Sequence, residues 1–140
     1  MSHFRHHTLL FAALLFAAPV LVDPQAAALA QAVQGTVARA VFTTGIENRE
    51  PVDDIARAPA TTETVYFFTE LRDLQGQKVT HRWKYNGTVM AEVGFDVGGA
   101  RWRVYSSKNF VPEWVGNWTV EVVDGGGTVL ETKSLTFGGQ

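Results

Sequence analysis

Residues 78–96 read KVTHRWKYNGTVMAEVGFD, and this stretch decides the fold class. Apolar and polar side chains alternate on both sides of Asn86-Gly87, which is the pattern of a β-hairpin with one buried face. The same alternation recurs along most of the chain beyond residue 36, in short segments separated by Gly, Asn and Asp, and no long helical periodicity competes with it. The sequence therefore predicts an all-β domain.

Seven segments carry the alternation, and we expect each to be a strand: 37–43, 64–71, 78–84, 88–97, 100–107, 117–123 and 128–137. Breaks in the alternation of the last segment imply a bulge. Seven short strands with frequent turns are typical of an immunoglobulin-like antiparallel β-sandwich. Between Gly45 and Glu63 the sequence shows no periodicity, and we interpret it as a long crossover between sheets.

The first hairpin can be tested by register, because a buried face must pair apolar with apolar residues. A two-residue turn at Asn86-Gly87 breaks the apolar face of the second strand. A three-residue loop over 85–87, with Gly87 left-handed, pairs Trp83 with Val89 and keeps that face continuous. We therefore predict the three-residue loop.

A second hairpin is predicted at Gly98-Gly99. A two-residue turn there aligns Phe95 with Trp102 on the apolar face and sets Asp96 opposite Arg101 on the outward face. The two predicted hairpins together would place all the outward side chains of residues 78–107 on one surface.

Composition limits the size and the class of the protein. A chain of 140 residues fits one domain, and its net charge of -2 gives no electrostatic basis for binding nucleic acid. The chain has no cysteine, which excludes disulfides, thiol catalysis and thiolate metal sites. The core, with four tryptophans available to it, must supply the stability.

The N-terminus has the plan of an export signal. A weakly cationic start is followed by an apolar run from Leu9 to Val22 that ends at Asp23-Pro24. This run is shorter than the roughly 20 residues that a bilayer span needs, and Ala28-Leu29-Ala30 offers a small-x-small cleavage site.

We therefore expect a signal peptide over residues 1–30, a linker over 31–36 and a β-sandwich domain over 37–140 that is periplasmic or secreted. The alternative is an uncleaved leader, which would anchor the domain in the inner membrane. Pro19 inside the apolar run and further small-residue sites leave this alternative open.

Several separate motifs resemble one bacterial family: VARAVFT (37–43), REPVD (49–53), FFTEL (67–71), HRWKYNG (81–87), RWRVYSSKN (101–109) and GNWTV (116–120). The chain resembles the uncharacterised family catalogued as domain of unknown function 2914. The resemblance implies the sandwich and an envelope address. It implies no catalytic residue and no ligand, so every candidate site rests on the chemistry of the residues.

The outward face of the predicted hairpins is rich in basic groups. They would form a basic strip able to hold a carboxylate or phosphate group of an envelope polymer: Arg82, Lys84, Arg101, Arg103 and Lys108. The alternative interpretation is a set of solvated cross-strand ion pairs with Glu92 and Asp96.

One tryptophan stands apart from the others. Trp83, Trp102 and Trp118 alternate with polar residues, which predicts that they belong to the core. Trp114 follows Pro112-Glu113 outside any alternating segment, so it is the aromatic candidate for a ligand contact, such as a glycan. The alternative is that its ring packs over the edge of the sandwich.

The sequence gives little support for a catalytic site or a metal site. His81 falls on the apolar face, which favours a core histidine satisfied by one hydrogen bond over a general base. Glu92 and Asp96 would be roughly 13 Å apart along one strand, too far for paired catalytic acids. The acidic residues of the crossover lack the calcium-loop pattern: Glu47, Glu50, Asp53 and Asp54. We expect no enzyme, no cofactor and no metal.

The sequence thus favours a non-catalytic exported module that binds an envelope protein or a cell-wall polymer through its loops and its basic strand face. The alternative is a purely structural or accessory domain, tethered to the membrane and without a small ligand.

Overall fold

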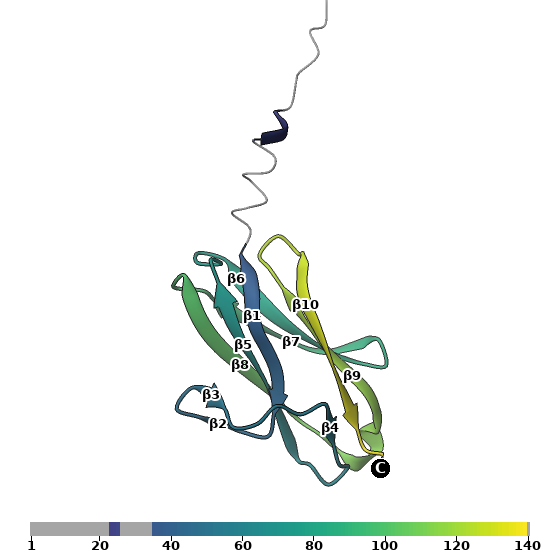
Figure 1. Ribbon diagram of the computed structural model, residues 1–140. Coiled ribbons are helices and arrows are strands. Elements are labelled where there is room, and N and C mark those ends of the chain that lie inside the picture. Colours follow the sequence, from purple (N-terminus) through teal and green to yellow (C-terminus); the bar gives the residue numbers. More distant parts are fainter. Residues whose placement is uncertain (1–22, 26–34, 140) are drawn as a thin grey trace, which may run out of the picture.

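The computed structural model describes residues 23–25 and 35–139 (Figure 1). The predicted signal peptide and linker lie outside the described residues, except for Asp23–Gln25 and the last two linker positions. In the part that is described, no helix is long and apolar enough to cross a membrane.

The all-β class is confirmed, and all seven predicted strands are present. They are β1 (Thr36–Thr43), β5 (Thr64–Arg72), β6 (Lys78–Tyr85), β7 (Thr88–Asp96), β8 (Arg101–Asn109), β9 (Gly116–Val123) and β10 (Val129–Phe137). The crossover contains three further two-residue strands, β2 (Ile46–Glu47), β3 (Glu50–Pro51) and β4 (Arg57–Ala58), and a 3-10 turn, η1 (Pro112–Trp114), precedes β9.

Two sheets enclose the core (Figure 1). One has three strands in the order β1-β5-β8, and the other has five in the order β4-β10-β9-β6-β7. Every pairing is antiparallel except that of β4 with β10. The short β2–β3 hairpin forms its own pair.

The core forms where the alternating apolar residues of the two sheets meet. Trp83 of β6 and Trp118 of β9 are fully buried, and Phe67 of β5 faces them from the three-stranded sheet. Phe110, in the connection after β8, lies against the rings of Trp118 and Phe137 at centroid distances of 4.7 and 4.5 Å. Large aromatic rings thus supply much of the buried area that stabilises the domain.

The predicted three-residue loop between β6 and β7 is wrong. Tyr85 pairs with Thr88, so the turn has only the two residues Asn86 and Gly87, with φ of 45° and 85°. Left-handed conformations at both positions are what a type I′ turn requires, and Asn-Gly is the preferred sequence for it.

The bulge that keeps the apolar face continuous lies further along β7. Met90 is the extra residue, because Lys84 pairs with Val89 while Trp83 pairs with Ala91. Trp83 therefore pairs with a residue two positions beyond its predicted partner, Val89. A shift of two positions keeps Ala91, Val93 and Phe95 on the inward face as predicted, whereas Val89 pairs with the outward Lys84, is 49% exposed and does not belong to the buried face.

The predicted hairpin at Gly98-Gly99 is also wrong. β7 and β8 are edge strands of different sheets, so the link between them crosses the sandwich. It runs beside the β5–β6 link, since the Val97 amide donates to the Gln77 carbonyl at 3.0 Å and the Asp73 amide to the Ala100 carbonyl at 2.9 Å. Phe95 therefore pairs with Val79 of β6 and not with Trp102.

Bulges also occur in the first and the last strand, β1 and β10. The expected bulge of the last strand is confirmed at Leu130, where the β9–β10 register shifts. A second register shift, at Ala38 of β1, was not predicted.

Candidate binding surface

The predicted basic strip is divided between the two sheets, and Lys108 lies on the inward side of its strand, where it contacts Trp114 and Trp118, and not on an outer face. Arg82 and Lys84 of β6 lie on the outer face of the five-stranded sheet, between the inward positions of His81, Trp83 and Tyr85. The other three predicted residues, Arg101, Arg103 and Lys108, belong to β8 in the three-stranded sheet. One surface cannot present all five.

The β6 pair is neutralised by neighbouring strands. Arg82 Nε donates to Glu92 at 2.7 Å, and its Nη1 lies 3.2 Å from Glu121, which also accepts from Lys84 Nζ at 2.9 Å. The Lys84 and Arg82 hydrogen bonds lower the pKa of the Glu121 carboxyl. Two cations face two anions here, as the ion-pair interpretation expected. Asp96 is paired too, but with Lys78 at 3.1 Å.

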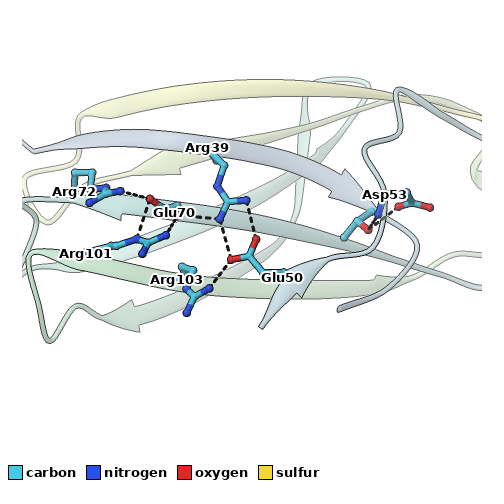
Figure 2. A network of polar contacts seen from close by, with 8 residues as sticks. Arg39, Glu50, Asp53, Glu70, Arg72, Arg101 and Arg103 are labelled. Atoms are coloured by element: carbon cyan, nitrogen blue, oxygen red, sulfur yellow. Dashed lines mark hydrogen bonds and ion pairs between the residues drawn. The ribbon is translucent and has the colours of Figure 1, made fainter. Parts of the chain in front are cut away.

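Arg101 and Arg103 belong to a larger network on the outer face of the three-stranded sheet (Figure 2). It joins four strands through two carboxylates and four guanidinium groups. We call it the arginine network: Arg39 of β1, Glu50 of β3, Glu70 and Arg72 of β5, and Arg101 and Arg103 of β8.

Glu70 is the buried centre of this network. Its side chain is only 4% exposed and accepts hydrogen bonds from Arg39 at 2.8 Å, Arg72 at 2.5 Å and Arg101 at 3.1 and 3.2 Å. The hydrogen bonds from Arg101 and Arg39 lower its pKa to about 2. Glu70 is therefore ionised at neutral pH.

Glu50 is the second carboxylate and is much more accessible, with 39% of its side chain exposed. Arg39 holds it with two hydrogen bonds of 2.8 and 3.1 Å, and Arg103 donates a further short one. These contacts, Arg39 first, lower its pKa to about 2. Since four arginines surround two glutamates, the network carries two positive charges in excess.

The β2–β3 hairpin delivers Glu50 to this face. Its base is fixed by Asp53, which accepts hydrogen bonds from the Thr43 hydroxyl at 2.6 Å and from the Thr44 hydroxyl and amide at 2.5 and 2.8 Å. At its tip, Asn48 and Arg49 have φ of 50° and 64°. The left-handed conformation costs about 1 kcal/mol for a residue such as arginine.

Lys108 and Trp114 lie together at one end of the sandwich. Lys108 Nζ is 4.8 Å from the centroid of the Trp114 ring and 5.7 Å from that of Trp118. The Trp114 carbonyl accepts a 3.0 Å hydrogen bond from Trp118 Nε1, and the Trp114 ring is half-buried against the core. Trp114 thus packs over the edge of the sandwich, as the alternative interpretation expected, and keeps part of its ring exposed.

His81 is a core residue, as predicted. It is fully buried, with Nε2 3.0 Å from Thr69 Oγ1 and Nδ1 2.8 Å from Ser106 Oγ, so it has two hydrogen-bond partners instead of the expected one. Burial lowers its pKa to about 3, which keeps the imidazole neutral at pH 7.

Sequence reasoning missed four members of the arginine network: Arg39, Glu50, Glu70 and Arg72. The signal was present in part, because Arg39 and Glu70 occupy polar positions of predicted strands. What brings them together is the pairing of β1 with β5 and of β5 with β8, which are distant in the sequence.

Comparison with known families bears on part of this chain. Residues 76–136 match the family model described as "Protein of unknown function (DUF2914)". The match confirms the family resemblance. The DUF2914 segment includes β6 to β9 and nearly all of β10, and hence Arg101 and Arg103, whereas the network residues of β1, β3 and β5 precede it. No curated protein matches the chain.

Proposed function

We propose that the domain is a non-catalytic binding module of the cell envelope, which holds an anionic group of a protein or cell-wall polymer on the outer face of the three-stranded sheet. The observation that carries this proposal is the excess of two positive charges in the arginine network. The balanced ion pairs around Arg82 on the opposite face offer no such excess.

The network has donors left for a ligand. A guanidinium group carries five N–H donors in a planar fork that matches carboxylate and phosphate oxygens. Arg72 and Arg101 expose 43% and 55% of their side chains, and Arg72 meets Glu70 through one nitrogen. Tyr105, which is 49% exposed and pairs with Phe68 on β5, adds an aromatic group to the same face.

The test compares two double variants that each remove two positive charges. The full chain, expressed with its own leader, is assayed for sedimentation with isolated envelopes at low and moderate salt. Arg72→Gln with Arg101→Gln should abolish the association, because both side chains lie in the arginine network. Arg82→Gln with Lys84→Gln should leave it unchanged. Equal behaviour of the two variants, or no association by the parent protein, overturns the proposal.

The proposed address is the periplasm or the outer side of the envelope, with the leader removed. It is supported by the apolar run and the small-residue cleavage site of the sequence. N-terminal sequencing of the protein from the periplasmic fraction should give a chain shortened by about 30 residues. Full-length protein in the inner membrane would overturn the cleaved form.

We also propose that the sandwich is immunoglobulin-like, and the strand order supports this. In the constant-type immunoglobulin fold, the first, second, fourth and fifth strands form one sheet and the third, sixth and seventh form the other. Counting the seven long strands here, the first, second and fifth form one sheet, and the third, sixth and seventh lie together in the other. The fourth strand, β7, differs because it pairs with the third.

A second candidate function is a purely structural or accessory domain. It is favoured by the way in which Glu50 and Glu70 tie β1, β3, β5 and β8 together, which is a structural task in itself. In that case, the Arg72 and Arg101 double variant would lose stability in a thermal melt and keep its envelope association.

A further inference from the structure

We propose that Glu50 occupies a carboxylate site that an acidic peptide segment takes over when it binds, and that the β2–β3 hairpin gives way at its tip to admit that segment. This inference rests on the proposed function, because it names the ligand class for the same face. Its test is separate from the envelope assay.

The first step is that the site already holds a carboxylate. Arg39 approaches Glu50 with two nitrogens on two oxygens, at 2.8 and 3.1 Å, which is the bidentate fork of arginine–carboxylate recognition. Arg103 donates from the other side. The pair of arginines is thus arranged for a carboxylate, and the chain itself supplies the present one.

The second step is that only one of the two carboxylates is exchangeable. Glu70 lies on β5, the central strand of its sheet, which is paired on both sides, and its side chain is 4% exposed. Glu50 lies on a strand of two residues whose partner also has only two, and its side chain is 39% exposed. Glu70 is a fixed part of the site, whereas Glu50 can leave it.

The third step concerns the hairpin. Asp53 fixes its base to Thr43 and Thr44, while at its tip Asn48 and Arg49 are both left-handed. The tip therefore carries local backbone strain that opening relieves. Opening at the tip separates Glu47 from Glu50, the pair next to Asn48 and Arg49, whereas the 3.0 Å bond from the Val52 amide to the Gly45 carbonyl lies at the base beside Asp53.

The fourth step identifies the occupant. Glu50 presents its carboxylate from an extended backbone beside β8, and the far edge of β8 has no partner strand within residues 35–139. An extended peptide with acidic side chains reproduces both features. When Glu50 leaves, the excess rises from two to three positive charges, because four arginines then face Glu70 alone, so a segment with several carboxylates is the complementary ligand.

The experiment measures the affinity of the full chain, processed in the cell, for poly-L-glutamate at low salt. Glu50→Gln removes the internal competitor and should tighten binding about tenfold. Glu47→Gln is the matched control: it removes the same charge from the same hairpin, and Glu47 forms no ion pair among the described residues. It should change the affinity by less than about twofold.

Hydrogen exchange on the unmodified protein gives a second measurement that needs no variant. Saturation with poly-L-glutamate should speed exchange at the amides of Glu47 and Glu50, the pair next to the tip. The Ile55 amide, bonded to the Phe42 carbonyl at 2.9 Å beyond the base of the hairpin, should keep its rate.

Any of these results would overturn the inference: equal affinities of the Glu50 and Glu47 variants, unchanged exchange rates at Glu47 and Glu50 in the saturated protein, or no binding of poly-L-glutamate. Equal or tighter binding of polygalacturonate or of inorganic polyphosphate would assign the site to a sugar acid or a phosphate polymer and would also overturn it. In each case, the envelope assay with the Arg72 and Arg101 variant still decides the proposed function independently.

Discussion

The Nε1–H group of Trp83 donates a 3.0 Å hydrogen bond to Oγ of Ser106 and thereby joins β6 of one sheet to β8 of the other across the core. The same hydroxyl lies 2.8 Å from Nδ1 of His81, whose Nε2 reaches Thr69 of β5. Among the described residues, no buried side-chain nitrogen or oxygen lacks a partner. The two sheets are thus connected by a satisfied polar cluster as well as by apolar packing.

Ser106→Ala should destabilise the domain by about 1–3 kcal/mol, because it leaves the Trp83 N–H group without a partner in a buried site. The measurement is urea denaturation followed by tryptophan fluorescence. Ser107→Ala is the control. Ser107 is exposed and points to the opposite face of β8, so its loss should cost less than about 0.5 kcal/mol. Similar midpoints for both variants would contradict the assigned role of the cluster.

Stability should fall as the pH is lowered from 6.5 towards 5. His81 has a folded-state pKa of about 3, depressed from 6.5 by burial, so the unfolded chain binds the extra proton in this interval. The contribution of neutral His81 to the free energy of unfolding is therefore fully present above pH 6.5. Below that pH, the free energy of unfolding decreases by up to about 1.4 kcal/mol per pH unit.

The measurement is the denaturation midpoint at several pH values between about 5 and 7, where ordinary carboxylates do not titrate. His81→Gln, which keeps a donor and an acceptor in the site, should flatten the dependence. A slope that survives this substitution would show that another group is responsible.

Glu70→Gln should cost about 1–3 kcal/mol, because the buried centre of the network loses the charge that three arginines share. Glu63→Gln, at an exposed position next to β5, should change stability by less than about 0.5 kcal/mol. Since the pKa of Glu70 is lowered from 4.5 to about 2, its contribution is present above pH 4.5 and is lost as the pH falls towards 2. The difference between parent and Glu70 variant should therefore shrink in acid, and a constant difference would count against this ion-pair role.

Trp118→Ala should cost about 3–5 kcal/mol, since its ring is fully buried between Tyr85, Phe110 and Trp114. Trp114→Ala should cost less, about 1–2 kcal/mol, because its ring is half-buried and covers only one side of Trp118. Chemical denaturation of both variants measures the difference. Equal losses would mean that Trp114 belongs to the core and has no exposed face for a ligand.

The strands could be predicted because each requires only local information. Alternation along residues 64–71 or 117–123 shows which face is buried, whichever strand lies next to it. The pairing could not be predicted in the same way. Gly98-Gly99 between two alternating segments fits a hairpin and a sheet-to-sheet crossover equally well, because Phe95 and Trp102 point inward in both cases.

The candidate site depends on this missing information. Arg101 and Arg103 were recognised as outward basic residues, but the wrong β7–β8 pairing placed them beside Arg82. Their true partners, Glu50 and Glu70, come from strands that precede them by many residues. The position of Lys108 could not be predicted either. Its ammonium group lies over the rings of Trp114 and Trp118 and not on the outer face of the strand.

The position of β5 has a consequence for the folding pathway. Among the long strands, β1 with β5, β6 with β7 and β9 with β10 pair with a direct neighbour in sequence, whereas the second edge of β5 pairs only with the more distant β8. Non-local pairing of this kind is formed slowly, on the order of milliseconds to seconds, because loop closure precedes the contacts that compensate for it. During that interval the run Val65-Tyr66-Phe67-Phe68 has an unpaired edge, so early intermediates of this chain should be its most aggregation-prone species.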